Sequence, residues 1–260
     1  MRRIGKSANK YLEAVADLFI PRTCCICGGE LRGFEKSFCT ECFAELPFTF
    51  FWHYRSNPAK DTFVGRTNIE DVIALMVYKG EIREAMHNFK YHGQIGIGEE
   101  LGELLGNAIS TSPFMVDALK EGITIVPIPL HRRKKRKRGY NQAEVIARGV
   151  QKGIIDYMLG NTIQMSKDDA GKSNASKSNA SKSDTSKSDA SKSDASKNNA
   201  KSEQNIIGKI IVEPHLLKRV RFTNTQTRLN KLERFKNIND AFEVNEKRLK
   251  RYCSKKKRKK

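Results

Sequence analysis

Apolar and polar positions alternate along the chain in patterns typical of both helices and strands. Between residues 7 and 19 apolar side chains recur at helical spacing, which predicts an amphipathic helix that ends at Pro21. The runs "VIALMVY" (72–78) and "ITIVPIPL" (123–130) are too short for helices and predict strands. Helical patterns follow them in "EIREAMHNFKYHG" and "NQAEVIARGVQKGI". This alternation of strand and helix predicts an α/β domain.

The pattern breaks down in the second half of the chain. From Lys172 the sequence repeats with a period of five, as KSNAS, KSNAS, KSDTS, KSDAS, KSDAS and KNNAK, without one large apolar side chain. Such a segment cannot bury enough apolar surface to offset the entropy of ordering, so residues 165–205 are predicted to be a disordered linker. An electrostatic tether is the alternative, but Lys and Asp largely cancel within the repeat. Apolar alternation typical of a strand resumes in "NIIGKIIVEPHLLKRVRF".

Positive charge is concentrated in two places. The chain holds 49 Lys and Arg against 29 Asp and Glu, a formal charge of +20, with clusters at residues 132–138 and 247–260. A polyanion such as nucleic acid is the natural partner of such a chain, and a merely soluble basic surface is the alternative. No apolar run approaches the roughly 18 to 20 residues that span a bilayer. Acidic Glu13 and Asp17 stand where a signal peptide needs its apolar core, so a cytoplasmic protein without membrane insertion is predicted.

Five of the six cysteines lie within nineteen residues, and four of them form two C-x-x-C pairs. Cys24 pairs with Cys27 and Cys39 with Cys42, with eleven residues between the pairs. Each C-x-x-C turn places two thiolates on one side of a tight knuckle, and two knuckles complete a tetrahedral Zn²⁺ site with no open position, so a structural zinc is predicted. Disulfides are disfavoured in a cytosolic chain, and a redox dithiol leaves the second pair unexplained. Cys25 is a spare thiol that could exchange with Cys24.

Seven consecutive cations stand between the predicted strand at 123–130 and the helix that follows it. A loop from strand to helix favours anions in α/β folds, because backbone N–H groups and the helix N-terminus point at it. The crowded cations would repel one another unless a multivalent anion offset the repulsion. The residues that the pattern offers to phosphate, pyrophosphate or nucleic acid are Arg132, Arg133, Arg136, Arg138, Gly139, Asn141 and Gln142. A solvated loop or a patch similar to a nuclear-localisation signal is the alternative.

Four blocks occur together in this sequence: the cysteine ribbon, "VYKGEIREAMHNFKYHG", "VPIPLHRRKKRKRGYNQAEVIA" and "RVRFTNTQTRLNKLERFKNINDAF". The combination resembles the ComF family of competence-associated proteins. The resemblance covers nearly the whole chain outside the repeat and the basic tail. Its most specific motifs are the RGYNQ block at 138–142 and the later spacing of Arg219, Arg221, Thr223, Gln226, Leu229, Arg234, Asn237, Ala241 and Phe242.

The resemblance implies a zinc ribbon fused to a type I phosphoribosyltransferase-like domain, an α/β fold built on a parallel sheet with flanking helices. It implies uptake or handling of single-stranded DNA during natural transformation in bacteria, with a DNA-uptake helicase and a recombination mediator as partners. The loop after "PIPL" would correspond to a pyrophosphate-binding loop, and Mg²⁺ with phosphoribosyl pyrophosphate would be the family's ligands. Arg219, Arg221, Thr223 and Gln226 would reach the ligand from a mobile segment.

The chain accordingly divides into six segments. They are an amphipathic N-terminal helix (1–21), the zinc ribbon (22–50), the first part of the phosphoribosyltransferase-like domain (51–164), the linker (165–205), the continuation of that domain with its mobile segment (206–246) and a basic tail (247–260). The linker is therefore expected to be an insertion within one domain.

One part of the family pattern is missing. The family ordinarily continues past the equivalent of Val244 into a hydrophobic strand and a D-D-x-x-T-T-G loop, whereas the only Asp-Asp pair here, Asp168-Asp169, opens the repeat. Phosphoribosyl transfer passes through a cationic sugar that carboxylates and Mg²⁺ help to hold, so catalysis is expected to be incomplete and the sheet to have an open edge. We therefore expect a truncated product. The alternatives are a zinc-ribbon nucleic-acid-binding module without catalysis and a product without function.

Five aromatic residues follow the ribbon closely. They are Phe48, Phe50, Phe51, Trp52 and Tyr54. Rings in such a position can stack on the bases of a single nucleic-acid strand, and they can also pack between two subdomains, which is the commoner role.

Overall fold

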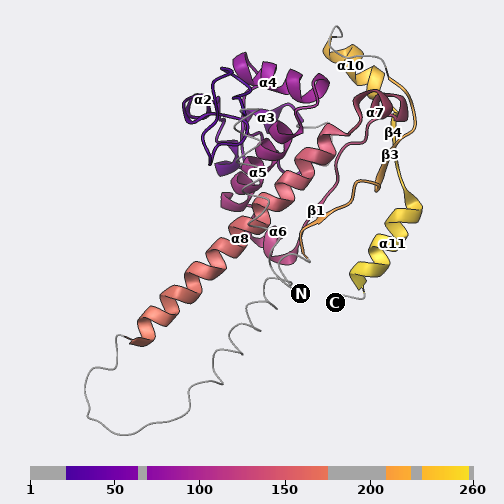
Figure 1. Ribbon diagram of the computed structural model, residues 1–260. Helices are drawn as coiled ribbons and strands as arrows, with labels where there is room; N and C mark the ends of the chain where they lie inside the picture. Colours follow the sequence, from indigo (N-terminus) through magenta and orange to yellow (C-terminus); the bar gives the residue numbers. More distant parts are fainter. Residues whose placement is uncertain (1–21, 64–68, 175–208, 224–229, 258–260) are drawn as a thin grey trace, which may run out of the picture.

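A computed structural model describes residues 22–63, 69–174, 209–223 and 230–257 of the chain (Figure 1). The helix expected at residues 7–19, the linker from residue 175 onward and the expected ligand residue Gln226 lie outside the described residues. Within the described part, no helix has the length and apolar character needed to cross a membrane.

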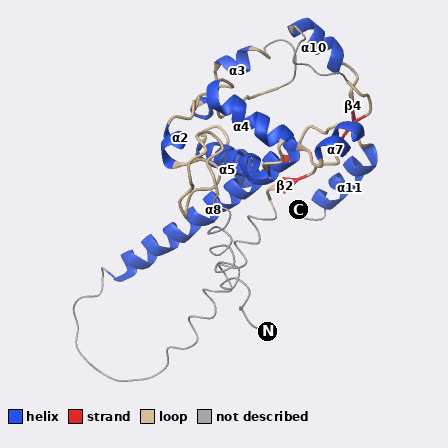
Figure 2. Ribbon diagram, turned by 45° about the horizontal axis from the view of Figure 1, so that its top comes forward, coloured by secondary structure: helices blue, strands red, loops and turns tan. Residues whose placement is uncertain are grey.

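The described elements are mostly helices, with a small parallel sheet and a separate antiparallel pair of strands (Figure 2). In chain order they are α2 (Thr40–Ala44), η1 (Phe51–His53), α3 (Pro58–Asp61), α4 (Gly80–Tyr91), α5 (Ile95–Thr111), α6 (Val116–Glu121), β1 (Thr124–Ile125), α7 (Arg132–Arg138), α8 (Gln142–Asn174), β2 (Ile211–Val212), β3 (Leu217–Arg219), α10 (Lys231–Ile238), β4 (Phe242–Val244) and α11 (Glu246–Lys257). The parallel sheet pairs β1 with β2, and the antiparallel pair joins β3 to β4.

Helices α5 and α8 form the centre of the fold and lie side by side (Figure 1). Two glycines on each helix face the other helix, spaced one turn apart: Gly102 and Gly106 on α5, Gly149 and Gly153 on α8. A Cβ atom on Gly102 would lie 2.5 Å from the backbone carbonyl oxygen of Ile146. The two backbones therefore approach each other more closely than any side chain would allow.

Two apolar clusters flank this helix pair. The first contains Phe89 of α4, which is fully buried, and Phe38 and Leu46 of the cysteine-rich segment. The second contains Val150 and Ile154 of α8 together with Ile210, which is also fully buried. These clusters attach the ribbon to one side of the helix pair and the parallel sheet to the other.

The segment after the linker returns to the body of the domain. Thr124 of β1 lies opposite Ile211 of β2 in parallel register, and the N–H of Ile211 donates to the carbonyl of Ile123 at 3.0 Å. The side chain of Gln151 on α8 donates to the carbonyl of Ile210 at 2.6 Å. Residues separated by more than fifty positions therefore build one sheet.

The sheet is smaller than the sequence pattern predicts. Only Thr124 and Ile125 of the apolar run 123–130 form a strand, because β2 offers pairing to that short stretch alone. The run 72–78 contributes an isolated bridge from Met76 to Phe48 rather than a strand. Both runs therefore have the composition of strands, but among the described residues few segments pair with them, so the strands stay short.

Two helices also differ from the sequence pattern. Residues 132–138, expected as a loop, form α7, with His131 as its N-cap and Gly139 ending it at φ +82°. Lys and Arg are good helix formers, which explains why a cationic run can adopt this conformation. Helix α8 continues to Asn174, past the boundary at 165 that the composition gives for the linker.

Candidate functional site

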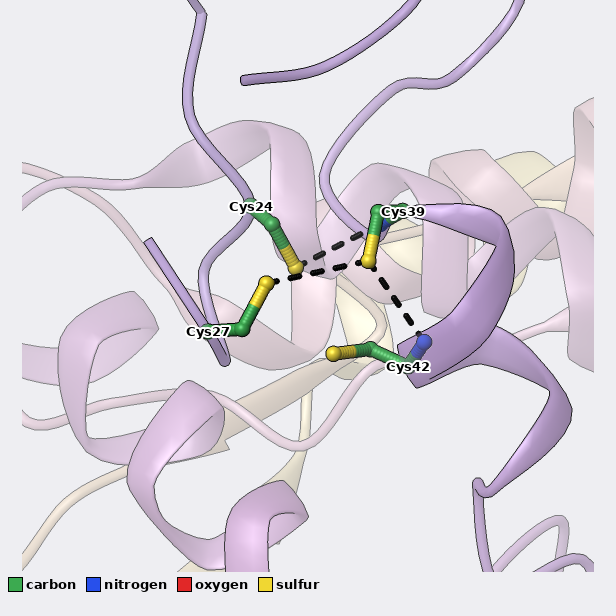
Figure 3. A group of neighbouring side chains, drawn as sticks. All are labelled: Cys24, Cys27, Cys39 and Cys42. Atoms are coloured by element: carbon green, nitrogen blue, oxygen red, sulfur yellow. Dashed lines mark hydrogen bonds between the residues drawn. The ribbon is translucent and has the colours of Figure 1, made fainter. Parts of the chain in front are cut away.

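The four cysteines of the two C-x-x-C pairs converge at one point (Figure 3). Their sulfur atoms all lie within 4.8 Å of one another, and the Sγ atoms of Cys27 and Cys39 are 3.7 Å apart. A disulfide would require about 2.05 Å. The grouping predicted from the sequence, Cys24, Cys27, Cys39 and Cys42, is confirmed, and it could hold one metal ion.

Local backbone geometry explains how the two knuckles form. In the first, the N–H of Gly28 donates to the carbonyl of Cys24 at 2.9 Å, and Gly28 takes a positive φ of 72°, which a residue with a side chain rarely adopts. In the second, Cys39 caps α2, and its Sγ accepts from the N–H of Cys42 at 3.5 Å. A helix N-terminus and a glycine turn therefore present the sulfurs to a common centre.

The cysteine centre favours a cation. Burial raises the pKa of the Cys24 thiol, but N–H groups of Cys27, Cys39 and Ile26 outweigh burial and lower this pKa to about 7. Burial raises the pKa of Cys42 most, hydrogen bonds with the neighbouring sulfurs raise it further, and repulsion from a Cys24 thiolate adds to both. A bound divalent metal removes this conflict by stabilising all the thiolates.

Cys25 does not belong to this group. Its side chain packs against the apolar cluster of Phe38 and Phe89, and burial raises the pKa of its thiol to about 12. It is therefore a core residue, and the exchange with Cys24 considered from the sequence has no support in this geometry.

Glu35 is a residue of the centre that sequence reasoning missed. Its buried carboxylate accepts from the N–H of Arg32 at 2.6 Å and from the N–H and hydroxyl of Thr40 at 2.7 Å each. These hydrogen bonds lower the pKa of Glu35 and tie the loop between the knuckles to the start of α2. The spacing of Glu35 four residues before Cys39 is the only sequence signal that could have suggested this role.

Polar contacts dock the ribbon onto the helix pair. The N–H of Ser37 donates to the carboxylate of Glu100 on α5 at 2.7 Å. Glu103, one turn further along α5, forms ion pairs with Lys36 of the ribbon and with Lys152 of α8. Glu103 therefore joins three parts of the fold.

We expect Glu103→Gln to destabilise the protein by about 1 kcal/mol at neutral pH, because both lysines are half exposed and their ion pairs are screened by water. Burial raises the pKa of the Glu103 carboxyl, but Lys152 and Lys36 outweigh it and hold the pKa below its ordinary value. The ion pairs therefore contribute stability above the ordinary carboxyl pKa, and this contribution is lost as the pH falls through the lowered value.

Urea denaturation of the unchanged protein and of Glu103→Gln, from neutral pH down to acidic pH, tests this ion-pair contribution to stability. Glu84→Gln on α4, an exposed carboxylate, is the control. A stability difference that stays constant from neutral to acidic pH would contradict the ion-pair role.

The cations of α7 divide into two groups. Arg132, Arg133 and Arg136 are exposed to solvent, whereas Lys134 and Arg138 are partly buried. The guanidinium of Arg138 donates to Oε1 of Gln142 at 3.0 Å and stacks over the ring of Tyr91 at 5.2 Å. An outer row of cations is therefore free to meet a ligand while an inner pair is held in place.

The rest of the RGYNQ block anchors α7 to the body of the protein. The hydroxyl of Tyr140 donates to the carbonyl of Phe89, and the amide of Asn141 donates to the carbonyl of Ile128 at 3.1 Å. Asn141 is buried, so its amide hydrogen-bonds to the backbone and does not lie on the exposed surface, where it was expected to bind a ligand.

Residues 219–223 lie against α7, as the resemblance implies for its second group of ligand residues. The ring of Phe222 is 5.3 Å from the ring of His131, 5.4 Å from Nζ of Lys134 and 5.9 Å from the guanidinium carbon of Arg133. Arg219 donates to the hydroxyl of Thr223, which is buried. The structure therefore brings these two segments, separated by the linker, into contact.

Arg221 has a different role from the one expected. Its guanidinium donates to the carbonyls of Asn237 at 3.1 Å and Asn239 at 2.6 Å, at the end of α10. These bonds connect the end of α10 to the segment that follows β3, and they use donors that a ligand contact would need.

Two buried donors at the contact of α7, α8 and β3 have no acceptor among the described residues. Burial, and then the charges of Arg219 and Arg138, lower the pKa of Lys134. The two buried donors are Nε2 of Gln142, a side chain with 8% exposure, and Nε of Arg219, and within the described part of the chain neither has a hydrogen-bond partner. Because buried donors are normally paired, cations and orphan donors gathered at one place suit an anion.

The aromatic residues after the ribbon are split between the two roles considered from the sequence. Trp52 is 7% exposed and Phe48 is partly buried, so these rings pack in the body. Phe50 and Tyr54 are 54% and 64% exposed. Packing therefore accounts for the inner rings only.

In comparisons with known proteins, no family model, no curated protein and no solved structure matches the chain. The assignment to the ComF family accordingly remains a hypothesis that rests on the sequence motifs. The cysteine centre and the contact of α7 with β3 rest on the geometry of the chain itself.

Proposed function

We propose that this chain is a ComF-like protein that handles single-stranded DNA during natural transformation, and that it binds phosphates at the surface formed by α7 and β3. The sequence motifs support the family, and the structure supports an anion-binding surface. The observation that carries the proposal is the crowding of Lys134, Arg138 and Arg219 around the orphan donors Gln142 Nε2 and Arg219 Nε.

The charge balance around α7 supports the same proposal. Lys135 reaches Glu144 at 4.0 Å, and Glu144 also pairs with Arg148. Among the described residues, neither Lys134, Arg138 nor Arg219 has an ion pair within 4.0 Å. A phosphate would supply the negative charge that the protein does not.

In this proposal the cysteine centre holds one Zn²⁺ and has no part in chemistry. Cys24, Cys27, Cys39 and Cys42 would fill its tetrahedral coordination, so no position is left for a substrate. The metal would fix the ribbon against α5, through Ser37 and Lys36, and so hold the helix pair on which α7 stands.

We assign binding and not phosphoribosyl transfer to the α7 surface. Transfer needs carboxylates that stabilise a cationic sugar, with Mg²⁺ in this family. At this contact the described side chains, Arg219, Lys134 and Gln142, are cationic or neutral. Such side chains can bind the phosphates of a ligand, but they cannot stabilise the positive charge that develops on the sugar during transfer.

Salt dependence tests phosphate binding directly. The logarithm of the affinity for an oligothymidylate should fall with the logarithm of the salt concentration, with a slope of about −0.7 per phosphate contacted. Replacing the exposed Arg132, Arg133 and Arg136 by Gln should make the slope shallower by about 2, as measured by fluorescence anisotropy of a labelled oligonucleotide with the full chain.

A control with the same loss of charge is available elsewhere on the surface. Lys79, Arg83 and Lys120 are exposed and lie outside α7. Their replacement by Gln should leave the slope close to that of the unchanged protein. A slope near zero for the unchanged protein, or equal effects of the two triple variants, would contradict the proposed site.

A further inference from the structure

Phe50 holds an exposed ring on a strained backbone. Its φ of 57° and ψ of 19° lie in the left-handed region, where a bulky side chain is rarely found. Glycine or asparagine would adopt this conformation at lower cost. Because the ring is also 54% exposed, its burial contributes little hydrophobic free energy to offset the backbone strain.

Neighbouring hydrogen bonds impose this conformation. Thr49, directly before Phe50, donates its N–H to the carbonyl of Leu75 at 3.0 Å and its hydroxyl to the carbonyl of Ala74. The same hydroxyl accepts from the N–H of Phe51 at 3.2 Å. The chain is therefore fixed on both sides of Phe50, and its ring is held outward.

Phe50 is part of a row of rings that runs from the core to the surface. Its ring centroid is 5.1 Å from that of the buried Trp52 and 6.1 Å from that of Phe48. His53 continues the row beyond Trp52 at 5.5 Å, and the exposed Tyr54 follows His53 at 6.4 Å. Phe50 thus rests directly on a buried ring, whereas Tyr54 joins the row through the exposed His53.

We propose that Phe50 and Tyr54 form a stacking platform for the bases of single-stranded nucleic acid, a second contact region in addition to the phosphate site of α7. This inference rests on the proposed function, since it assumes that the chain binds a single strand. Exposed rings stack on any base because every base has a π-face, and unpaired bases alone present that face. The charge of +20 favours this occupant over a neutral apolar peptide.

The platform has a built-in reporter. Trp52 is the only tryptophan of the chain, and it contacts Phe50. Saturating the unchanged protein with an oligothymidylate should quench the fluorescence of Trp52, because bases stack within reach of the indole. Inorganic polyphosphate, which has the charge but no bases, should bind to α7 and leave the fluorescence unchanged.

Variants separate stacking from charge. Phe50→Gly should weaken oligothymidylate binding about tenfold, as expected for the loss of one stacked base, without changing the salt slope. Phe50→Tyr should restore the affinity. Phe34→Gly is the control, because Phe34 is 77% exposed in the ribbon and has no ring contact among the described residues.

Each result decides between the proposals. Oligothymidylate binding without a change in Trp52 fluorescence, or an equal effect of polyphosphate, overturns the platform and leaves the phosphate site standing. Equal losses for Phe50→Gly and Phe34→Gly also overturn it. If the unchanged protein binds no oligothymidylate at low salt, both the platform and the proposed function are wrong.

Discussion

Chelation of the metal at the cysteine centre is expected to unfold the ribbon, residues 22–50, and to loosen the core beneath it. The apolar cluster inside the ribbon is small, consisting of Leu31 and the ligands Cys24 and Cys39, with Ile26 and Cys42 packed against it. Structural zinc contributes about 10 to 16 kcal/mol of apparent binding free energy in zinc-finger peptides. A core of this size cannot replace that contribution, so ribbon folding should depend on the metal.

The effect should spread beyond the ribbon. Phe38 and Leu46 belong to the same cluster as Ile82 and Phe89 of α4 and Leu101 of α5. Without the ribbon these side chains lose their cover. Hydrogen exchange should therefore accelerate in α4 and at the start of α5 after chelation, and less at Val150 and Ile154 in the second cluster.

Cys39→Ser tests the same prediction by mutation. We expect the variant to lose its bound zinc, measured as metal per chain, and to melt at a lower temperature than the unchanged protein. Cys253→Ser is the control, because Cys253 is an exposed cysteine on α11. Full zinc content and unchanged melting of Cys39→Ser would rule out the predicted centre.

The cysteine centre could be predicted because its geometry is local. Each C-x-x-C pair fixes two sulfurs within one turn of chain, so the spacing already carries the chemistry. Glu35 could not be identified in the same way, because its role depends on where Arg32 and Thr40 direct their donors. Local motifs such as C-x-x-C can be predicted from a sequence. The side chains that stabilise them through hydrogen bonds can be identified only in the folded structure.

The arrangement of cations to which we assign anion binding was predictable in part. The cationic run marks α7, but charge alone does not show that Lys134 and Arg138 turn inward while their neighbours face solvent. The contact of Arg219 with this region was anticipated only through the resemblance to a family. The periodicity of a sequence cannot predict a contact between Gln142 and Arg219, because the whole repeat separates these two residues.

The strands were the least predictable elements. The apolar runs 72–78 and 123–130 have strand composition, yet a strand requires a partner at the right register. Residues 211–212 are the only described segment that pairs with β1. Strand extent therefore depends on distant segments, whereas helix α4 and the first turns of α8 follow from the local periodicity of their own residues.

The glycines of α5 and α8 show the same division between local pattern and distant partner. Their spacing, Gly102 with Gly106 and Gly149 with Gly153, is visible in the sequence and typical of a close helix contact. Which helix meets which is a property of the fold. Because of this contact, we expect the substitution of glycine by alanine to have opposite effects on stability at two positions of α8.

Gly153→Ala should severely destabilise the protein, whereas Gly160→Ala should not. A Cβ atom at Gly153 would lie 2.3 Å from the carbonyl oxygen of Glu103, and backbone cannot swing aside as a side chain can. We expect a loss of about 3 kcal/mol or more, since the two helices must separate. A Cβ atom at Gly160 would meet nothing within 4 Å, so alanine there should raise helix stability by up to about 1 kcal/mol.

Urea denaturation followed by circular dichroism compares the two variants with the unchanged protein. Zinc content distinguishes loss of the helix contact from loss of the ribbon, because the metal should be retained by Gly160→Ala and by the folded fraction of Gly153→Ala. Equal stabilities of the two variants would mean that α5 and α8 do not approach through their backbones.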